Sequence, residues 1–286
     1  MRKIGVLVDN TAQFPRHSFP GQNLIRVATH DVAFRGAIYP AGDGLKVSEL
    51  PSFAREQDAP KLLSPSPEKF NQILTGMGTE FDEVLVLVHS SHLSSTFYNA
   101  SLAASSLQGR LQVNVIDTNT FSAGLGMLAQ LAAQVIQQGA DLAEVEHIVR
   151  QQAAHTYTIV CCPGLSYLSQ NGIVDPAQAV VGEFLSMMPV FSFEDERLTP
   201  IEKMRNNRNI TEFFIEFVEE FDDLQHIAVV QSVPPLLHET RSMRQIFLEN
   251  YPTTSYSEHN LNLTTAILFS PKMVGLIVAE TVSEDG

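Results

Sequence analysis

Residues 83–107 read EVLVLVHSSHLSSTFYNASLAASSL, and this stretch decides the fold class. Val84–Val88 is an unbroken apolar run, which predicts a buried strand over 83–88. From residue 96 onward the apolar side chains recur at helical spacing, which predicts a helix over 96–107. The junction between the two is rich in hydroxyl groups and contains no acid: Ser90, Ser91, Ser94, Ser95 and Thr96.

A hydroxyl-rich junction of this kind is typical of either an anion site or a helix cap. The first N–H groups of a helix have no partner inside it and lie at the positive end of the helix dipole. Small hydroxyl donors beside them can therefore help to hold a phosphate, a sulfate or a carboxylate. The simpler alternative is that Ser94 or Ser95 caps the helix while the other hydroxyls face water. This stretch alone leaves both interpretations open.

The same alternation of short apolar strands and helical patterns runs through the chain, which indicates the α/β class. Strands are expected at 3–9, 24–34, 83–88, 111–117, 157–162, 226–232 and 274–281. Helices are expected at 47–57, 67–77, 96–107, 126–139 and 209–221. We expect two α/β lobes, residues 1–155 with a mostly parallel sheet and residues 156–286 with a mixed sheet.

The composition excludes several classes of partner. The 286 residues carry a formal net charge of −14 and no run rich in Lys or Arg, which argues against nucleic acid or an anionic membrane surface. No stretch approaches the ~20 apolar residues that a membrane span needs. Cys161 and Cys162 are neighbours on an expected strand, so their side chains point to opposite faces and do not suit a disulfide or a shared metal. We expect a cytoplasmic protein without a metal centre or cofactor.

Two motifs predict catalysis or nucleotide binding only weakly. Gly124, Gly126 and Ala129 fit G-x-G-x-x-A, but they fall inside a helical pattern six residues after a strand, so close helix packing is the better interpretation. A hydrolase could use Ser90 or Ser91 with His89 or His92 as base and Asp9 or Asp117 as the acid, although no G-x-S-x-G elbow is present. This enzyme stays open as an alternative.

Polar residues follow the expected strands of the first half at the point where each strand ends. Asp9, Ser90 and Asp117 lie at or just beyond three such ends. In an open parallel sheet the ligand crevice lies outside the carboxyl ends of the strands, so Thr11 and Ser64 are expected on the same polar rim. A rim of hydroxyls with few cations suits one small anionic head group.

Several segments together resemble a known family. They are DNTA at 9–12, SPSPEKF at 64–70, SSHLSSTFYNA at 90–100, VIDTNTFSAGLGML at 115–128 and the long stretch that runs from LSYLSQNG to IEKMR at 165–205. In this order they are similar to motifs of the DegV family of bacterial fatty-acid-binding proteins, and the resemblance covers nearly the whole chain. It implies two α/β lobes with a long-chain fatty acid buried between them. Such proteins are carriers that present the acid to a kinase related to dihydroxyacetone kinases.

The resemblance also implies roles for particular residues. Ser90 and Ser91 would hold the carboxylate, aided by Ser64, Thr11 and Thr96. Arg205 would lie on the surface that faces the kinase. The apolar tunnel for the acyl tail would be walled by Leu62, Phe184, Met187, Met188 and Phe191.

Three positions depart from the family pattern at the head-group end. Leu62 and Leu63 replace a Thr-Ser pair, and Leu268 lies near the position of a histidine. Apolar groups in place of hydroxyls would favour a less polar ligand, such as an ester or an alcohol. A binder of a less polar lipid is therefore a further alternative.

Overall fold

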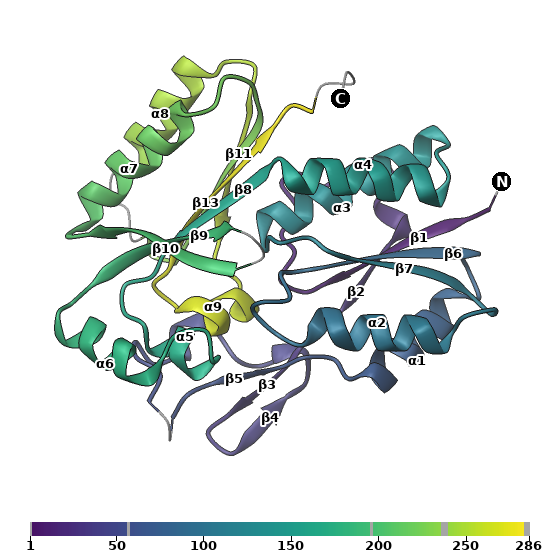
Figure 1. Cartoon of the computed structure of the whole chain (residues 1–286), viewed down its shortest axis with the longest axis horizontal. Coiled ribbons are helices and arrows are strands. Elements are labelled where there is room, and N and C mark those ends of the chain that lie inside the picture. Colours follow the sequence, from purple (N-terminus) through teal and green to yellow (C-terminus); the bar gives the residue numbers. More distant parts are fainter. Residues whose placement is uncertain (1, 56–57, 195–196, 236–239, 283–286) are drawn as a thin grey trace.

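The structure is a computed structural model that describes residues 2–55, 58–194, 197–235 and 240–282. Within these ranges the chain builds two lobes around a four-stranded and a six-stranded sheet, with a small third sheet beneath them (Figure 1). Both the α/β class and the contrast between a parallel and a mixed sheet are confirmed.

The first sheet is parallel throughout, in the order β2-β1-β6-β7. Its strands are β1 (Ile4–Asp9), β2 (Ile25–Ala28), β6 (Glu83–Val88) and β7 (Gln112–Asp117). Every residue of β1 and β6 is buried, because helices cover both faces of the sheet. One face packs on α3 (Ala123–Gln138) and α4 (Leu142–Ala154), the other on α1 (Pro67–Met77) and α2 (Thr96–Ser106).

The second sheet is mixed, in the order β10-β9-β8-β13-β11-β12, with only β11 and β12 parallel among its pairs. Its strands are β8 (Thr156–Cys161), β9 (Met188–Glu194), β10 (Arg197–Met204), β11 (Leu224–Gln231), β12 (Ser255–Asn260) and β13 (Val274–Glu280). One face packs on α7 (Asn207–Glu219) and α8 (Thr240–Asn250). Since all its strands follow residue 155, we keep the division at 155–156 as a proposal.

Two expectations about the first lobe were wrong. The segment 24–34 is not one strand: it turns at Thr29–His30, and β3 (Asp31–Phe34) pairs instead with β4 (Ala37–Tyr39) and β5 (Lys61–Leu63). The helix expected at 47–57 is only a short 3-10 turn, Val47–Glu49, and residues 56–57 lie outside the described residues. Leu50 is extended because it precedes Pro51, and this ends the turn.

The remaining described elements are short. They are the 3-10 turns Gln22–Leu24 and Pro40–Gly42 and the helices α5 (Ser166–Gln170), α6 (Pro176–Phe184) and α9 (Leu263–Phe269). The α9 helix contacts α5 and β5, and Asn262 before it donates to the backbone carbonyls of Asn10 and Thr11 at 3.2 and 3.1 Å. These bonds tie the second lobe to the loop after β1.

The adjacent cysteines lie as the strand period predicts. Both are buried and free, and Cys161 belongs to the core under α7 and α8 while Cys162 belongs to the core between the lobes. Burial raises the pKa of the Cys161 thiol to about 12, so it stays protonated at neutral pH.

The glycines of α3 serve packing, as the sequence indicates. A Cβ on Gly126 would collide with the backbone carbonyl of Gln13, and one on Gly124 would collide with Thr120. Gly126 thus lets the loop after β1 approach the helix closely. It belongs to the body of the helix and does not form a turn that could hold phosphates.

We predict opposite effects for two glycine-to-alanine changes. Gly126→Ala should lower the free energy of unfolding by roughly 1–3 kcal/mol, because the backbone of Gln13 must move. Gly76→Ala in α1 meets nothing within 4 Å and should raise it by about 0.4–1 kcal/mol through the unfolded state. Urea denaturation measures both, and equal effects would contradict the packing role of Gly126.

Candidate functional site

The site is built at the carboxyl ends of β1 and β6, which are neighbours in the sheet. Asp9 is the last residue of β1, and His89 directly follows β6. Both are buried, and Asp9 Oδ2 accepts hydrogen bonds from the His89 backbone N–H at 2.7 Å and from His89 Nδ1 at 3.0 Å. Thr11 donates to the other carboxylate oxygen through its N–H at 2.8 Å and its hydroxyl at 2.6 Å.

These four bonds keep the Asp9 carboxylate ionised. Burial alone would raise the pKa of Asp9, but the charge and hydrogen bond of His89 outweigh it. His30 and the Thr11 hydroxyl act in the same direction, so the pKa lies well below its ordinary value. An ion pair this deep in the protein has all its lone pairs occupied, which offsets the cost of its burial.

From His89 a line of hydroxyls continues into the start of α2. His89 Nε2 lies 2.7 Å from Ser94 Oγ, and Ser94 Oγ lies 2.8 Å from Thr96 Oγ1. Thr96 Oγ1 in turn lies 3.2 Å from Ser64 Oγ, at the end of β5. Three segments distant in the chain therefore contribute hydroxyls to one polar cluster.

A second histidine, which follows β2 in the chain, contacts the Thr96 hydroxyl of this line. His30 is buried, and its Nε2 lies 2.9 Å from Thr96 Oγ1 while its Nδ1 lies 2.6 Å from Asn10 Oδ1. Burial lowers the pKa of His30 to about 4, although Asp9 acts against this. His30 is therefore a neutral imidazole at physiological pH.

The predicted head-group residues fall into two groups. The structure brings Ser64 and Thr96 together in the polar cluster. Thr11 and Ser90 have other bonds: the Thr11 hydroxyl donates to Asp9, and the buried Ser90 hydroxyl lies 3.4 Å from Asn119 Oδ1. Ser91 is half-buried at the rim, and its backbone N–H donates to Asp117 at 3.1 Å.

The cap alternative is partly right. Ser95 occupies the N-cap position of α2 without a side-chain cap bond, whereas Ser94 Oγ accepts the N–H of Thr96 at 3.2 Å. Ser94 therefore combines a bond to the helix start with bonds to His89 and Thr96. Sequence reasoning left out Ser94, His89 and His30 as head-group residues. The signal for His89 and His30 was their position just after parallel strands, where Asp9 also lies.

Among the described residues, neither histidine of the hydrolase alternative has a ring hydrogen bond to Ser90 or Ser91. Both ring nitrogens of His89 are engaged by Asp9 and Ser94, so this ring does not serve Ser90 or Ser91. His92 is exposed. The acid, imidazole and hydroxyl that do lie in line are Asp9, His89 and Ser94. Within the described part of the chain, no three potential metal ligands gather.

Apolar residues from both lobes meet beside the polar cluster, and we call them the interlobe cluster. Phe121 of the first lobe packs on Phe269 and Phe193 of the second, with ring centroids 4.6 and 5.9 Å apart. Other members are Val32, Phe34, Leu93, Val160, Ile267 and Leu268, with Leu62 packed against them. Leu93 lies between Ser91 and Ser94 in the chain, so the polar and apolar parts are continuous.

The residues predicted to wall the tunnel do not all lie on one surface. Leu62 and Phe191 lie at the interlobe cluster. Met188 packs on the opposite face of the six-stranded sheet, because alternate residues of β9 point to opposite faces. Met187 is half-buried. Phe184 is 88% exposed on α6, so it does not line an interior space and we no longer propose it.

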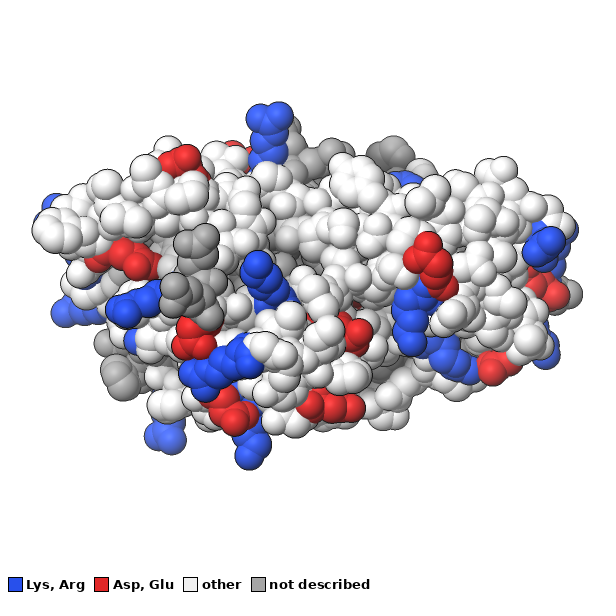
Figure 2. All heavy atoms as spheres, turned by 90° about the horizontal axis from the view of Figure 1, so that it is seen from below, with Lys and Arg blue, Asp and Glu red and all other residues white. Residues whose placement is uncertain are grey.

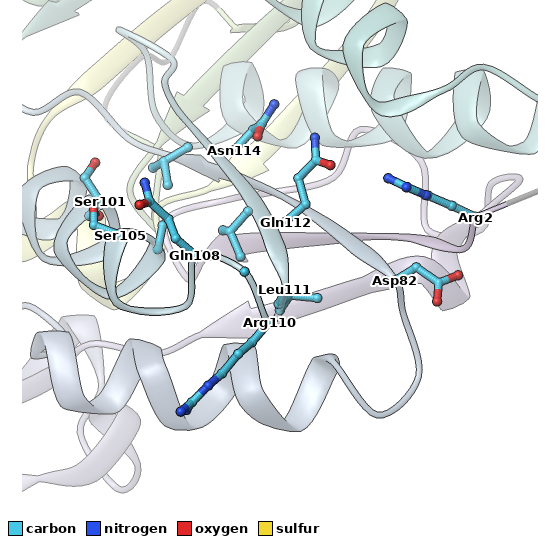
Figure 3. Close-up of a pocket in the computed structure, with 13 residues that line it drawn as sticks. Arg2, Asp82, Ser101, Ser105, Gln108, Arg110, Leu111, Gln112 and Asn114 are labelled. Atoms are coloured by element: carbon cyan, nitrogen blue, oxygen red, sulfur yellow. The ribbon is translucent and has the colours of Figure 1, made fainter.

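The surface offers a polar cavity and mixed charge. A cavity of about 810 Å³ opens along the exposed edge of β7, where Arg2, Gln112 and Asn114 line it (Figure 3). Such a lining does not suit an acyl tail. Among the described residues on the face in Figure 2, acidic and basic groups are interspersed. None of the described helices is long and apolar enough to cross a membrane.

Two buried threonines provide a test of the polar cluster. Thr96→Val should lower the free energy of unfolding by roughly 1–3 kcal/mol, because its hydroxyl contacts His30, Ser94 and Ser64. Thr265 is equally buried, and its Oγ1 is the buried side-chain atom without a partner among the described residues. Thr265→Val should therefore be neutral or stabilising. Denaturant unfolding measures both, and an equal loss would contradict the role of Thr96.

Comparison with known proteins identifies a family and several relatives that this chain resembles. The family model of DegV, described as an uncharacterised protein family, matches residues 3–281. The chain is 28% identical over 225 residues to a Thermotoga maritima protein named fatty acid-binding protein, which covers 76% of this chain and 77% of that one.

Solved structures agree with this match. A DegV family protein from Thermus thermophilus, whose structure is described as fatty acid binding, superimposes with a TM-score of 0.83 at 25% identity, covering 98% of this chain and all of that one. The fatty acid kinase B3 protein from Streptococcus pneumoniae, loaded with linoleic acid, has the same fold with a TM-score of 0.82 at 14% identity over 98% and 100% of the two chains. The chain belongs to the DegV family.

Proposed function

We propose that this protein binds a long-chain fatty acid between its lobes and carries it without chemical change. The observation that supports the proposal is the continuity of the polar cluster with the interlobe cluster. Leu93 is buried in the interlobe cluster between Ser91 and Ser94, and Leu62 packs on it two residues before Ser64. A molecule with one small polar head and one long apolar tail matches both parts at once.

The two parts would contribute differently to binding. Burial of the tail supplies most of the affinity, at about 0.8 kcal/mol per methylene. The head group decides orientation, because a buried carboxylate without hydrogen-bond partners costs several kcal/mol. Ser64, Ser91, Ser94 and Thr96 offer hydroxyls at the rim, and the dipole of α2 adds positive potential at its start.

The relatives support the same ligand class. The Thermotoga protein carries fatty acid binding in its name, the Thermus structure is described by it, and the Streptococcus protein is loaded with linoleic acid. We extend this to a long-chain acid here, in a cytoplasmic carrier. Leu268 is buried in the interlobe cluster, and with Leu62 it makes the wall near the head group apolar. Competition between palmitate and hexadecanol distinguishes a free acid from a less polar lipid.

A titration with palmitate tests the head-group site. Ser91→Ala should weaken binding by roughly 1–3 kcal/mol, the usual cost of an acceptor left without its donor. Ser105→Ala, on the far end of α2, is the matched control and should bind like the wild type. Isothermal calorimetry measures the three affinities. Unchanged palmitate affinity in Ser91→Ala would contradict a role of Ser91 in the site. If the protein instead hydrolysed an acyl ester, and Ser94→Ala abolished this hydrolysis, it would be an enzyme and not a carrier.

The second lobe provides the proposed contact with a fatty acid kinase. Arg205 is exposed after β10, beside a cavity of about 390 Å³ lined by Glu202, Glu212 and Phe213. Arg205→Ala should leave palmitate affinity unchanged and reduce phosphorylation of the bound acid by a cognate kinase. Arg208→Ala is the control, since Arg208 is already paired with Glu212 at 2.9 Å. Loss of palmitate binding in Arg205→Ala would place Arg205 in the ligand site instead.

A further inference from the structure

A small cavity between the lobes is lined by polar side chains of both. It has a volume of about 150 Å³, and we call it the basic cavity. From the first lobe, Arg16 of the loop between β1 and β2 lines it together with Gln130 and Gln134 of α3. From the second lobe, His226 of β11 and Ser255 of β12 line it. None of its lining residues belongs to the polar cluster, so the basic cavity is a separate site.

The wall of the basic cavity has no carboxylate among the described residues. Arg16 has no ion-pair partner in the described part of the chain. Four other cavities each have acidic residues in their walls, among them Glu80, Asp82, Glu83 and Glu212. In a chain with 32 acidic residues against 18 Lys and Arg, a cavity with an unpaired guanidinium and no acid is suited to an anion.

The wall also offers hydrogen-bond donors from several directions. The side chains of Gln134, Gln225 and Ser255 have no hydrogen bond among the described residues. The Gln130 amide donates one N–H to the carbonyl of Arg16 at 3.1 Å and has a second N–H. These side chains come from a helix and two strands, and Arg16 comes from a loop. Donors on several sides suit a tetrahedral oxyanion better than a planar carboxylate.

His226 has one ring nitrogen available for such a ligand. His226 Nε2 lies 2.8 Å from Ser257 Oγ, and the same oxygen lies 2.9 Å from His259 Nε2. With both rings neutral, one ring donates to the hydroxyl and the other accepts its hydrogen. His226 Nδ1 has no partner among the described residues. An anion beside it selects the arrangement in which His259 donates to Ser257 and Ser257 donates to His226 Nε2, because His226 Nδ1 then carries the hydrogen.

Basic groups surround this pair of histidines. Burial lowers the pKa of His226 to about 4, and the charges of His259 and Arg16 act in the same direction. Burial also lowers the pKa of His259, and His17 adds to this. Among the described residues no carboxylate acts on either ring, and α3, α4, β8 and β13 add only neutral side chains to the wall. A bound anion would therefore raise the pKa of His226.

The volume of the basic cavity limits the size of the ligand. At about 30 Å³ per water molecule, it corresponds to roughly five waters, which suits one phosphate or sulfate group and excludes a whole nucleotide. Arg16 is exposed, so the cavity is open on that side. The net charge of −14 opposes anions at long range, but physiological salt screens charges beyond about 8 Å, so the residues of the wall decide.

We propose that the basic cavity is a phosphate-binding site, in which Arg16 of the first lobe and His226 of the second hold one oxyanion between them. The guanidinium offers paired N–H groups that match two phosphate oxygens, and the imidazole adds its Nδ1–H. The amides of the wall serve the remaining oxygens. This site does not rest on the proposed function, since it shares no lining residue with the polar cluster.

Calorimetry of the full chain with inorganic phosphate at pH 7, without lipid, tests the site. Binding should saturate at one phosphate per chain, with acetate weaker. Arg16→Gln and His226→Gln should each lower phosphate affinity about tenfold to a hundredfold. Arg110→Gln is the matched control, because Arg110 lines the cavity at β7. Arg16 is exposed, so its replacement keeps the fold. Absence of saturable binding, or wild-type affinity in Arg16→Gln, would overturn the proposal.

The pH dependence of sulfate binding tests the part played by His226. Sulfate is the probe because it keeps its charge where a phosphate ester titrates, at a pKa of about 6. Sulfate affinity should rise as the pH falls from about 7 to about 5, since the bound anion favours the imidazolium form. His226→Gln should remove most of this rise, and His147→Gln, on the exposed side of α4, should keep it. An undiminished rise in His226→Gln would overturn the role of His226.

Two further ligands identify the source of the phosphate group. Glycerol 3-phosphate presents it as a small ester, and vesicles that contain phosphatidic acid present it as a lipid head group. Tighter binding of the ester than of inorganic phosphate supports the site and identifies a small phosphate ester. Vesicle binding that Arg16→Gln abolishes supports it as a head-group site, and preference for inorganic phosphate supports it as a site for the ion itself.

Discussion

The carboxylate of Asp9 is buried at the end of a central strand, and the rest of the site depends on how it is neutralised. Four donors from Thr11 and His89 surround it, so the loops after β1 and β6 are fixed to each other. A buried carboxylate deprived of such partners costs several kcal/mol, which makes these loop conformations obligatory. Because His89 is held there, Ser94 and Thr96 at the start of α2 are held as well. The hydroxyls of the rim are therefore positioned before any ligand arrives.

Sequence reasoning predicted the parts of this structure that depend on local periodicity. The strand over 83–88 has the expected bounds, and the helix expected at 96–107 is observed at Thr96–Ser106. It failed where long-range pairing decides. The turn at Thr29–His30 and the pairing of β3 with β5 depend on a segment thirty residues away in the chain, and α9 is a seven-residue helix formed against the other lobe. Such contacts leave no periodic signal.

The prediction of the site residues also succeeded where strand positions decide and failed where loop conformation decides. Strand ends indicated the correct edge of the sheet, and Ser64 and Thr96 do meet there. That Ser94 and not Ser90 contacts His89 was not predictable, because it depends on which hydroxyl the loop turns toward the ring. Phe184 shows a different limit: an apolar residue at the end of a helix resembles a core residue in the sequence, but the packing of α6 leaves it exposed.

Residues from both lobes form the interlobe cluster, an apolar surface that ends at the hydroxyl rim. The most direct measurement is native mass spectrometry of the protein as purified from cells, followed by extraction and identification of whatever is bound. We expect a complex with one long-chain fatty acid per chain, and we expect denaturation to release the acid. A protein of bare mass that also fails to take up added long-chain acids would contradict it.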